Sequence, residues 1–309
     1  MAIATTYRTC PRSGRQFEAN AEKLITANAV AAVVFLLIGG VLALGVALTR
    51  WPAVHWLQAD TFYQVLTAHG IDMLIFWIIF FEIAVLYFCA STLLRCRIAT
   101  PRIAWLAFAL MLIGAVVNNY AVYKGGSSVM MTSYVPMMAE QSFYLGLILF
   151  AVGALIGCFV FFGTLVVAKR DKTYEGSVPL VTFGAITAAI IAVFTIASGA
   201  IILIPTWLLS LGVIDKVDPL IYRMIWWAFG HSSQQINVAA HVSVWYLVAA
   251  VVFGAKPMSE RVSRGAFLLY ILFLQLASAH HLLADPGLST NWKVVNTSYF
   301  MYFAVLASM

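Results

Sequence analysis

Long apolar stretches recur through almost the whole chain, and they limit its fold more than any other feature. A helix needs about 20 residues to cross the hydrocarbon core of a membrane. Seven stretches reach or approach that length: residues 24–48, 61–94, 103–122, 143–167, 179–211, 220–254 and 265–283. An eighth begins near Val295 and continues to Met309.

These stretches are expected to be helices. Only helices and closed barrels satisfy every backbone hydrogen bond in lipid, and the alternation of apolar and polar residues that is typical of barrel strands is missing from the sequence. The composition agrees, since 63% of the residues are hydrophobic and 10% are charged, against about 25% charged in an ordinary soluble domain. The sequence predicts an all-α, polytopic transmembrane helix bundle with seven complete spans and part of an eighth.

The basic residues are sorted by the side of the membrane on which they fall. With the N-terminus placed in the cytoplasm, the inner segments hold all but five of the 18 Lys and Arg residues. The five on the outer side are Arg50, Lys124, Lys216, Arg223 and Lys293. Because inner loops are enriched in Lys and Arg, this sorting predicts a cytoplasmic N-terminus. It also accounts for the net charge of +6 without a nucleic-acid partner.

Four of the six histidines fall at similar predicted depths in the outer half of the membrane. Span two enters from the outer side, which places His69 about 12 Å deep at a rise of about 1.5 Å per residue. Span seven leaves toward the outer side, which places His280 and His281 about 6–8 Å deep. His231 lies about 10–11 Å deep when the membrane edge is taken near Met224.

These histidines predict a metal site. Imidazoles inside a membrane helix are costly unless something binds them, and neutral imidazole suits iron, copper and zinc. Each histidine alone could instead bond a backbone carbonyl, so the prediction rests on the adjacent pair His280 and His281 together with His231 at matching depth. His241 lies ten residues further, on another helix face and in the inner half. A structural or proton-path role is expected for it instead.

With these residues in place, the chain resembles the catalytic subunit of the heme–copper oxidase superfamily, cytochrome c oxidase subunit I, over its whole length. The segment Ala68-His69-Gly70 is similar to the one that supplies an axial ligand of the low-spin heme. Gly230-His231 is similar to the segment that gives the first ligand of the non-heme metal. His280-His281, followed by Ala284-Asp285-Pro286-Gly287, resembles the His-His helix and is most like the B-type branch.

The resemblance implies cofactors, partners and a location. It implies a low-spin heme bound by His69, a high-spin heme, and copper or iron held by His231, His280 and His281. It implies a multi-pass protein of the cell inner membrane with a cytoplasmic N-terminus. A redox subunit of cupredoxin or cytochrome c type would donate the electrons, and nitric oxide or O2 would accept them.

Gln235 departs from the pattern of the oxygen-reducing members. In those members a proline follows the first metal-ligand histidine and a tyrosine stands one turn after it, whereas this chain reads His231-Ser-Ser-Gln-Gln235. A glutamine can donate and accept hydrogen bonds but cannot give up an electron and a proton. Splitting O2 needs four electrons, whereas reducing two nitric oxide molecules to nitrous oxide and water needs two. Gln235 as a catalytic residue therefore favours nitric oxide reduction.

Terminal cytochrome c oxidase activity, with O2 reduced to water, remains the alternative to nitric oxide reduction, and a tyrosine from the next helix could then substitute. Tyr270 is expected to be too far for this, ten residues and about 15 Å before His280.

The superfamily's tenth helix supplies the remaining heme ligands, and no histidine follows His281 in this sequence. We therefore expect residues 1–309 to be the N-terminal portion of one subunit I-like membrane domain, from a truncated gene product or an incomplete subunit.

Two carboxyl groups in span two are candidate functional groups, since charges buried in a membrane are functional by default. Asp72 follows His69 by three residues on the same face, and could orient that imidazole or meet a heme propionate or water. Glu82 is mid-span and could carry protons, or could be a neutral acid bonded to a neighbouring helix.

A transporter and a structural subunit are the rival classes of function. A transporter is expected to have broken helices in paired halves. A structural subunit would have no reason to gather four histidines in one layer.

Overall fold

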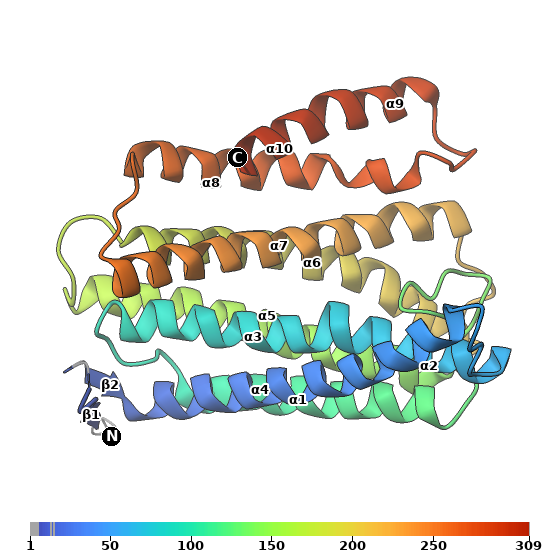
Figure 1. The fold of residues 1–309 in the computed structure, drawn as a ribbon, viewed down its shortest axis with the longest axis horizontal. Coiled ribbons are helices and arrows are strands. Elements are labelled where there is room, and N and C mark those ends of the chain that lie inside the picture. Colours follow the sequence, from blue (N-terminus) through green and yellow to red (C-terminus); the bar gives the residue numbers. More distant parts are fainter. Residues whose placement is uncertain (1–5, 13, 15, 309) are drawn as a thin grey trace.

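The computed structural model describes residues 6–12, 14 and 16–308, and their fold is a bundle of long helices lying side by side (Figure 1). The predicted all-α class is confirmed. The strands in the described part of the chain form one short antiparallel hairpin, β1 (Tyr7–Thr9) with β2 (Gln16–Glu18), which lies immediately before the first helix.

Six helices in the described part of the chain are long and apolar enough to cross a membrane. Five of them are α1 (Ala19–Arg50), α4 (Pro101–Tyr123), α5 (Gln141–Arg170), α6 (Leu180–Ser210) and α7 (Pro219–Phe253). Many large apolar side chains on their outer faces are exposed, among them Leu37, Val166 and Phe253. Such a surface is unfavourable in water and suits lipid.

The other long span is a continuous helical run over Ala59–Thr92. It consists of α2 (Ala59–Ile71), the π-helical segment η1 (Asp72–Phe76), α3 (Trp77–Tyr87) and the π-helical segment η2 (Phe88–Thr92). Single π-helical turns inside an α-helix change the register of the faces on either side and occur often at functional sites. The first of these begins three residues after His69.

The seventh predicted span differs from expectation in its form. It is α8 (Glu260–Leu276) followed by a 3₁₀ turn, η3 (Ser278–Leu282). The chain then returns through α9 (Thr290–Val294), the π-helical segment η4 (Val295–Phe300) and α10 (Met301–Ser308), which packs beside α8 at one side of the bundle (Figure 1). Seven complete spans therefore remains a prediction, because α8 is shorter than the six long helices.

Helix α7 carries His231, and local signals set both of its ends. The Asp218 side chain accepts hydrogen bonds from the backbone N–H groups of Leu220 and Ile221, and Pro219 occupies the first turn. Both features are typical of a helix start, because the first N–H groups have no partner within the helix. Gly254 follows the last turn in the left-handed conformation, with φ of 63°, and so ends the helix.

Candidate metal centre

Three histidines from distant parts of the sequence converge beside the N-terminal half of α7. The candidate ligand atoms of His231, His280 and His281 all lie within 4.8 Å of one another. Nδ1 of His231 is 3.2 Å from Nε2 of His281, and His231 is 1% exposed. Nδ1 of His280 lies 2.7 Å from the carbonyl oxygen of Ala277. That contact leaves Nε2 as the ligand atom His280 can offer.

The donor set fits a transition metal. Two metal–nitrogen bonds of about 2.0–2.1 Å at a tetrahedral angle put the two nitrogens about 3.3 Å apart, close to the 3.2 Å between His231 and His281. A metal-binding histidine also usually donates its second ring N–H to a backbone carbonyl or carboxylate, as His280 can do to Ala277. Neutral imidazole nitrogens suit copper or iron, so these residues could hold the non-heme metal.

The local setting of the histidine pair corrects one sequence expectation. We expected both histidines to lie within the apolar helix of residues 265–283. They lie instead in η3, after α8 has ended at Leu276. The tighter winding of a 3₁₀ turn rotates adjacent side chains further apart than an α-helix does. The two rings nevertheless lie close, with centroids 4.1 Å apart.

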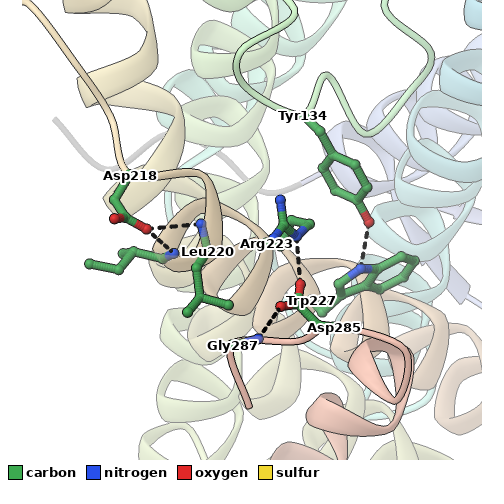
Figure 2. A network of polar contacts seen from close by, with 8 residues as sticks. Tyr134, Asp218, Leu220, Arg223, Trp227, Asp285 and Gly287 are labelled. Atoms are coloured by element: carbon green, nitrogen blue, oxygen red, sulfur yellow. Dashed lines mark hydrogen bonds and ion pairs between the residues drawn. The ribbon is translucent and has the colours of Figure 1, made fainter.

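Trp227 supports the pair from the neighbouring helix, a role that hydropathy does not reveal. Its ring stacks on His281 with centroids 3.9 Å apart and planes 5° from parallel. Its indole N–H donates to the hydroxyl of Tyr134, in the connection between α4 and α5, at 2.6 Å (Figure 2). The position of Trp227 one turn before His231 was the available signal, since residues four apart share a helix face.

An ion pair joins α7 to the segment that follows the histidines. Nε of Arg223 donates to Asp285 at 2.7 Å, and the other oxygen of Asp285 accepts from the backbone N–H of Gly287 at 3.0 Å (Figure 2). The Arg223 guanidinium, with the Gly287 N–H, holds the pKa of the Asp285 carboxyl below its usual range. The Arg223 guanidinium, one turn inside α7, thus has a carboxylate partner.

Gln235 contacts α8, and this corrects the distance argument about Tyr270. The hydroxyl of Tyr270 donates to Oε1 of Gln235 at 2.6 Å, and Tyr270 is 4% exposed. The helical rise separates Tyr270 from His280 along their own segment, but the long side chain of Tyr270 reaches across to α7. A buried phenol therefore does stand beside Gln235, one turn from His231.

His69 and Asp72 lie on the second long span and contact different neighbours. Nδ1 of His69 is 2.9 Å from the carbonyl oxygen of Gly39 in α1, an arrangement that leaves Nε2 as the nitrogen that could bind a metal. Asp72 is fully buried and accepts from the side-chain amide of Asn119 in α4 at 2.8 Å. Among the described contacts, Gly39 and not Asp72 orients the His69 ring. The contact of Asp72 with a heme propionate or water stays a prediction.

The remaining candidates lie away from the three-histidine cluster. His241 bonds the carbonyl oxygen of Asn237 on its own helix at 2.6 Å and stacks on Phe81. Glu82 is buried in the middle of α3. Trp226 is buried and packs between Tyr222 and Phe229, as expected of a residue that serves packing.

Fold and site together define a polytopic membrane protein with a partly buried histidine cluster suited to a transition metal. Residues 23–309 match the family described as "Cytochrome C and Quinol oxidase polypeptide I". The chain therefore belongs to this family, the subunit I family of the heme–copper oxidases.

Named relatives agree with this assignment. Cytochrome c oxidase subunit 1 of Thermus thermophilus is 28% identical over 255 residues, which cover 81% of this chain and 44% of the relative. The heme–copper oxidase subunit I+III of Aeropyrum pernix is 23% identical over 273 residues, 82% of this chain and 33% of the relative. A solved heme–copper terminal oxidase dimer matches with a TM-score of 0.85 and 26% identity, covering 94% of this chain and 51% of that one. The chain thus spans about half the length of these proteins, or less.

Proposed function

We propose that this chain is the metal-binding part of a membrane heme–copper oxidoreductase that reduces nitric oxide to nitrous oxide. The convergence of His231, His280 and His281, with Gln235 one turn further along α7, is the observation that carries the proposal. His231, His280 and His281 would hold copper or iron. His69 would supply one axial ligand of a low-spin heme, and a high-spin heme would complete the site.

The metals and hemes, when bound, supply the electrons and the Lewis acidity of the reaction. The chain's own residues orient and enclose that chemistry. Gly39 fixes the ring of His69, and Ala277 fixes that of His280. Trp227 covers one face of His281 and thereby excludes water from it.

Gln235 is the residue on which the choice of nitric oxide depends. Its Oε1 accepts a hydrogen bond from the Tyr270 hydroxyl. Its amide N–H groups are the donors that it can offer to a substrate oxygen. An amide orients a substrate without redox chemistry of its own. That suits a two-electron reduction better than the four-electron cleavage of O2.

Reduction of O2 to water is the second candidate, and Tyr270 is the observation that favours it. A phenol can deliver both an electron and a proton. The hydroxyl of Tyr270 stands 2.6 Å from Gln235, which occupies the position of the oxidase tyrosine. The matched relatives that carry the name cytochrome c oxidase point the same way. Under this reading Gln235 would hold Tyr270 in place, and Tyr270 would supply the proton.

The proposed setting follows from charge and depth. The sorting of Lys and Arg supports a cytoplasmic N-terminus, and we propose the cell inner membrane as the location, as the resemblance implies. The histidine cluster would then lie near the outer surface. A cupredoxin or cytochrome c type redox subunit would deliver electrons from that side.

The test uses the full-length protein, purified in detergent with its hemes and metal. Electrons are supplied by a chemical donor, and nitrous oxide formation from nitric oxide is measured beside O2 uptake. The proposal expects nitrous oxide at a rate well above that of O2 reduction. Rapid four-electron O2 reduction without released peroxide would reject it in favour of the second candidate.

Two substitutions separate the candidates further. Tyr270→Phe removes only the hydroxyl that contacts Gln235. It should leave nitric oxide reduction within about threefold of wild type, whereas an oxidase that used Tyr270 would lose roughly 100-fold or more in O2 reduction. His280→Ala should remove the non-heme metal, measured by elemental analysis, while the low-spin heme spectrum remains. Loss of both signals would contradict the assignment of His280.

A further inference from the structure

Helix α8 ends just before the histidine pair, and its end releases a backbone carbonyl from the helical pattern. If α8 continued, the N–H of His280 would bond the carbonyl of Leu276, four residues earlier. It bonds the carbonyl of Ala277 at 3.2 Å instead, in the 3₁₀ turn η3. The carbonyl of Leu276 is therefore left without this partner, as the last carbonyls of a helix are.

Asn296 supplies the missing donor from the segment that returns beside α8. Its side-chain amide donates to the carbonyl oxygen of Leu276 at 2.6 Å, and Asn296 is fully buried in η4. A backbone carbonyl at membrane depth has no water to bond and is costly when it stays unpaired. Asn296 thus holds the end of α8 where the histidine turn begins.

Ser232 of α7 holds the same end of α8 from a second helix. Its hydroxyl donates to Oε1 of Gln275 at 2.8 Å, and Ser232 is fully buried. Gln275 comes immediately before Leu276, and Ser232 comes immediately after His231. Side-chain hydrogen bonds of this kind join transmembrane helices. A proline at position 232, as in the pattern of the oxygen-reducing members, could not make this bond.

The two amide side chains are not explained by stability alone. Nε2 of Gln275 and Oδ1 of Asn296 are buried without a hydrogen-bond partner among the described residues. A buried polar atom without a partner costs stability, and apolar side chains of the same shape can serve a packed contact as well as a hydrogen-bonded pair. What the amides add is direction, because their bonds meet at two consecutive residues just before the histidine turn.

The spacing that depends on this end of α8 is narrow. Nδ1 of His231 and Nε2 of His281 are 3.2 Å apart, close to the spacing of about 3.3 Å for two nitrogens on one metal ion. A binding constellation must be held within about 0.5 Å of its productive geometry. The two histidines lie on segments that are distant in sequence, so contacts between the segments must set the spacing.

We propose that Ser232 and Asn296 are positioning residues, which fix the end of α8 and thereby hold the histidine pair at the distance from His231 that one metal ion requires. Ser232 acts through Gln275, and Asn296 acts through the carbonyl of Leu276. The inference rests on the metal site of the proposed function. It holds for nitric oxide or O2, because it concerns only how the metal ligands are held.

The affinity of the full-length holoenzyme for its non-heme metal tests the proposal. The protein in detergent is equilibrated with increasing chelator, and the retained metal is measured by elemental analysis beside the heme spectrum. Ser232→Ala should lower the affinity roughly tenfold, as expected when a contact behind the metal ligands is lost, with the low-spin heme spectrum unchanged. Ser233→Ala is the matched control and should keep the wild-type affinity, because the Ser233 hydroxyl bonds Gly230 of its own helix.

A double variant tests whether Ser232 acts through its bond. Gln275→Leu removes the acceptor of that bond and should match Ser232→Ala. The two substitutions together should then lose roughly tenfold rather than hundredfold in affinity, and additive losses would overturn this part of the proposal. Asn296→Leu should also lower the affinity roughly tenfold, whereas Thr297→Val, at the exposed neighbouring position of η4, should not.

Hydrogen–deuterium exchange separates positioning from a general structural role. Exchange of the backbone N–H groups is followed by mass spectrometry in the same variants. In Ser232→Ala and Asn296→Leu the peptide that contains η3 should exchange faster, whereas peptides from α4 and α5 should exchange as in the wild type. Faster exchange along the whole of α7 and α8 would show that the bonds merely stabilise the helices, and would overturn the proposal.

The outcomes separate the two levels of inference. A wild type that binds its metal tightly, with unchanged affinity in Ser232→Ala and Asn296→Leu, refutes the positioning role alone. A wild type whose non-heme metal is unaffected by His280→Ala refutes the metal site, and with it the proposed function. If Asn296→Leu fails to assemble, Ser232→Ala and Gln275→Leu decide the question, because unchanged affinity in both would overturn the proposal.

Discussion

The close approach of α4 and α5 gives the sharpest prediction about the stability of the bundle. A Cβ atom built on Gly114 would lie 2.5 Å from the carbonyl oxygen of Gly146 and 2.5 Å from the backbone nitrogen of Phe150. Ordinary contacts between such atoms begin near about 3.5 Å. Gly114→Ala therefore forces the two helices about 1 Å apart, because backbone atoms cannot rotate away as a side chain can.

The size of the effect follows from two opposing terms. Overpacking of a well-packed contact costs about 1–3 kcal/mol, and the higher helix propensity of Ala returns up to about 1 kcal/mol. A net loss of about 1–2 kcal/mol in the free energy of unfolding is expected. Gly40→Ala in α1 is the matched control, because its Cβ would meet nothing within 4 Å. It should be neutral, or stabilising by up to about 1 kcal/mol.

Unfolding by a denaturing detergent, followed by circular dichroism in mixed micelles, measures both variants. A second test uses Gly146→Ala, whose Cβ would lie 2.7 Å from the carbonyl oxygen of Gly114. Because both substitutions open the same contact, the double variant should lose less than the sum of the single losses. The reasoning is refuted if Gly114→Ala is as stable as Gly40→Ala, since backbone contact would then not limit the helix separation.

Two further predictions concern the surroundings of the histidine cluster. Trp227→Leu removes both the stacking on His281 and the bond to Tyr134, and should lower the affinity for the bound metal roughly tenfold, measured by competition with a chelator; Trp227→Phe, which keeps an aromatic ring, should lose less, and equal losses would contradict the stacking role. Asp285→Asn should lower the stability by about 1 kcal/mol at neutral pH. Since the pKa of Asp285 is depressed in the folded state, the ion pair stabilises above the unfolded value of about 3.9 and is lost as the pH falls through the folded value. The difference in melting temperature between wild type and Asp285→Asn should therefore close below about pH 4, and a difference that persists there would show that charge is not its cause.

The positions of the six long spans were predictable because they depend on local properties of the sequence. The predicted segment 220–254 and the observed Pro219–Phe253 differ by one residue at each end. Proline and an acidic cap mark the start and glycine marks the end, and these signals act through the backbone of the same few residues. The three metal-ligand candidates could be named for a similar reason. Histidine in an apolar span is rare, so it is noticeable in the sequence before its contacts are known.

The contacts of the site were not predictable in the same way. The bonds of Tyr270 to Gln235, Arg223 to Asp285 and Trp227 to Tyr134 join residues 35, 62 and 93 positions apart. They depend on how each helix is rotated about its axis. A span that is apolar toward both lipid and protein has no polar face to reveal that rotation.

The end of α8 shows the same division. The sequence by itself determined that two adjacent histidines would close an apolar segment, because the residues before them are mostly apolar. Only the packing of α8 against α7 and η4 decided that Ser232 and Asn296 would bond the residues just before the histidine turn. Hydropathy is a sum over one segment, whereas these bonds join three segments, and their positions follow from the tertiary arrangement alone.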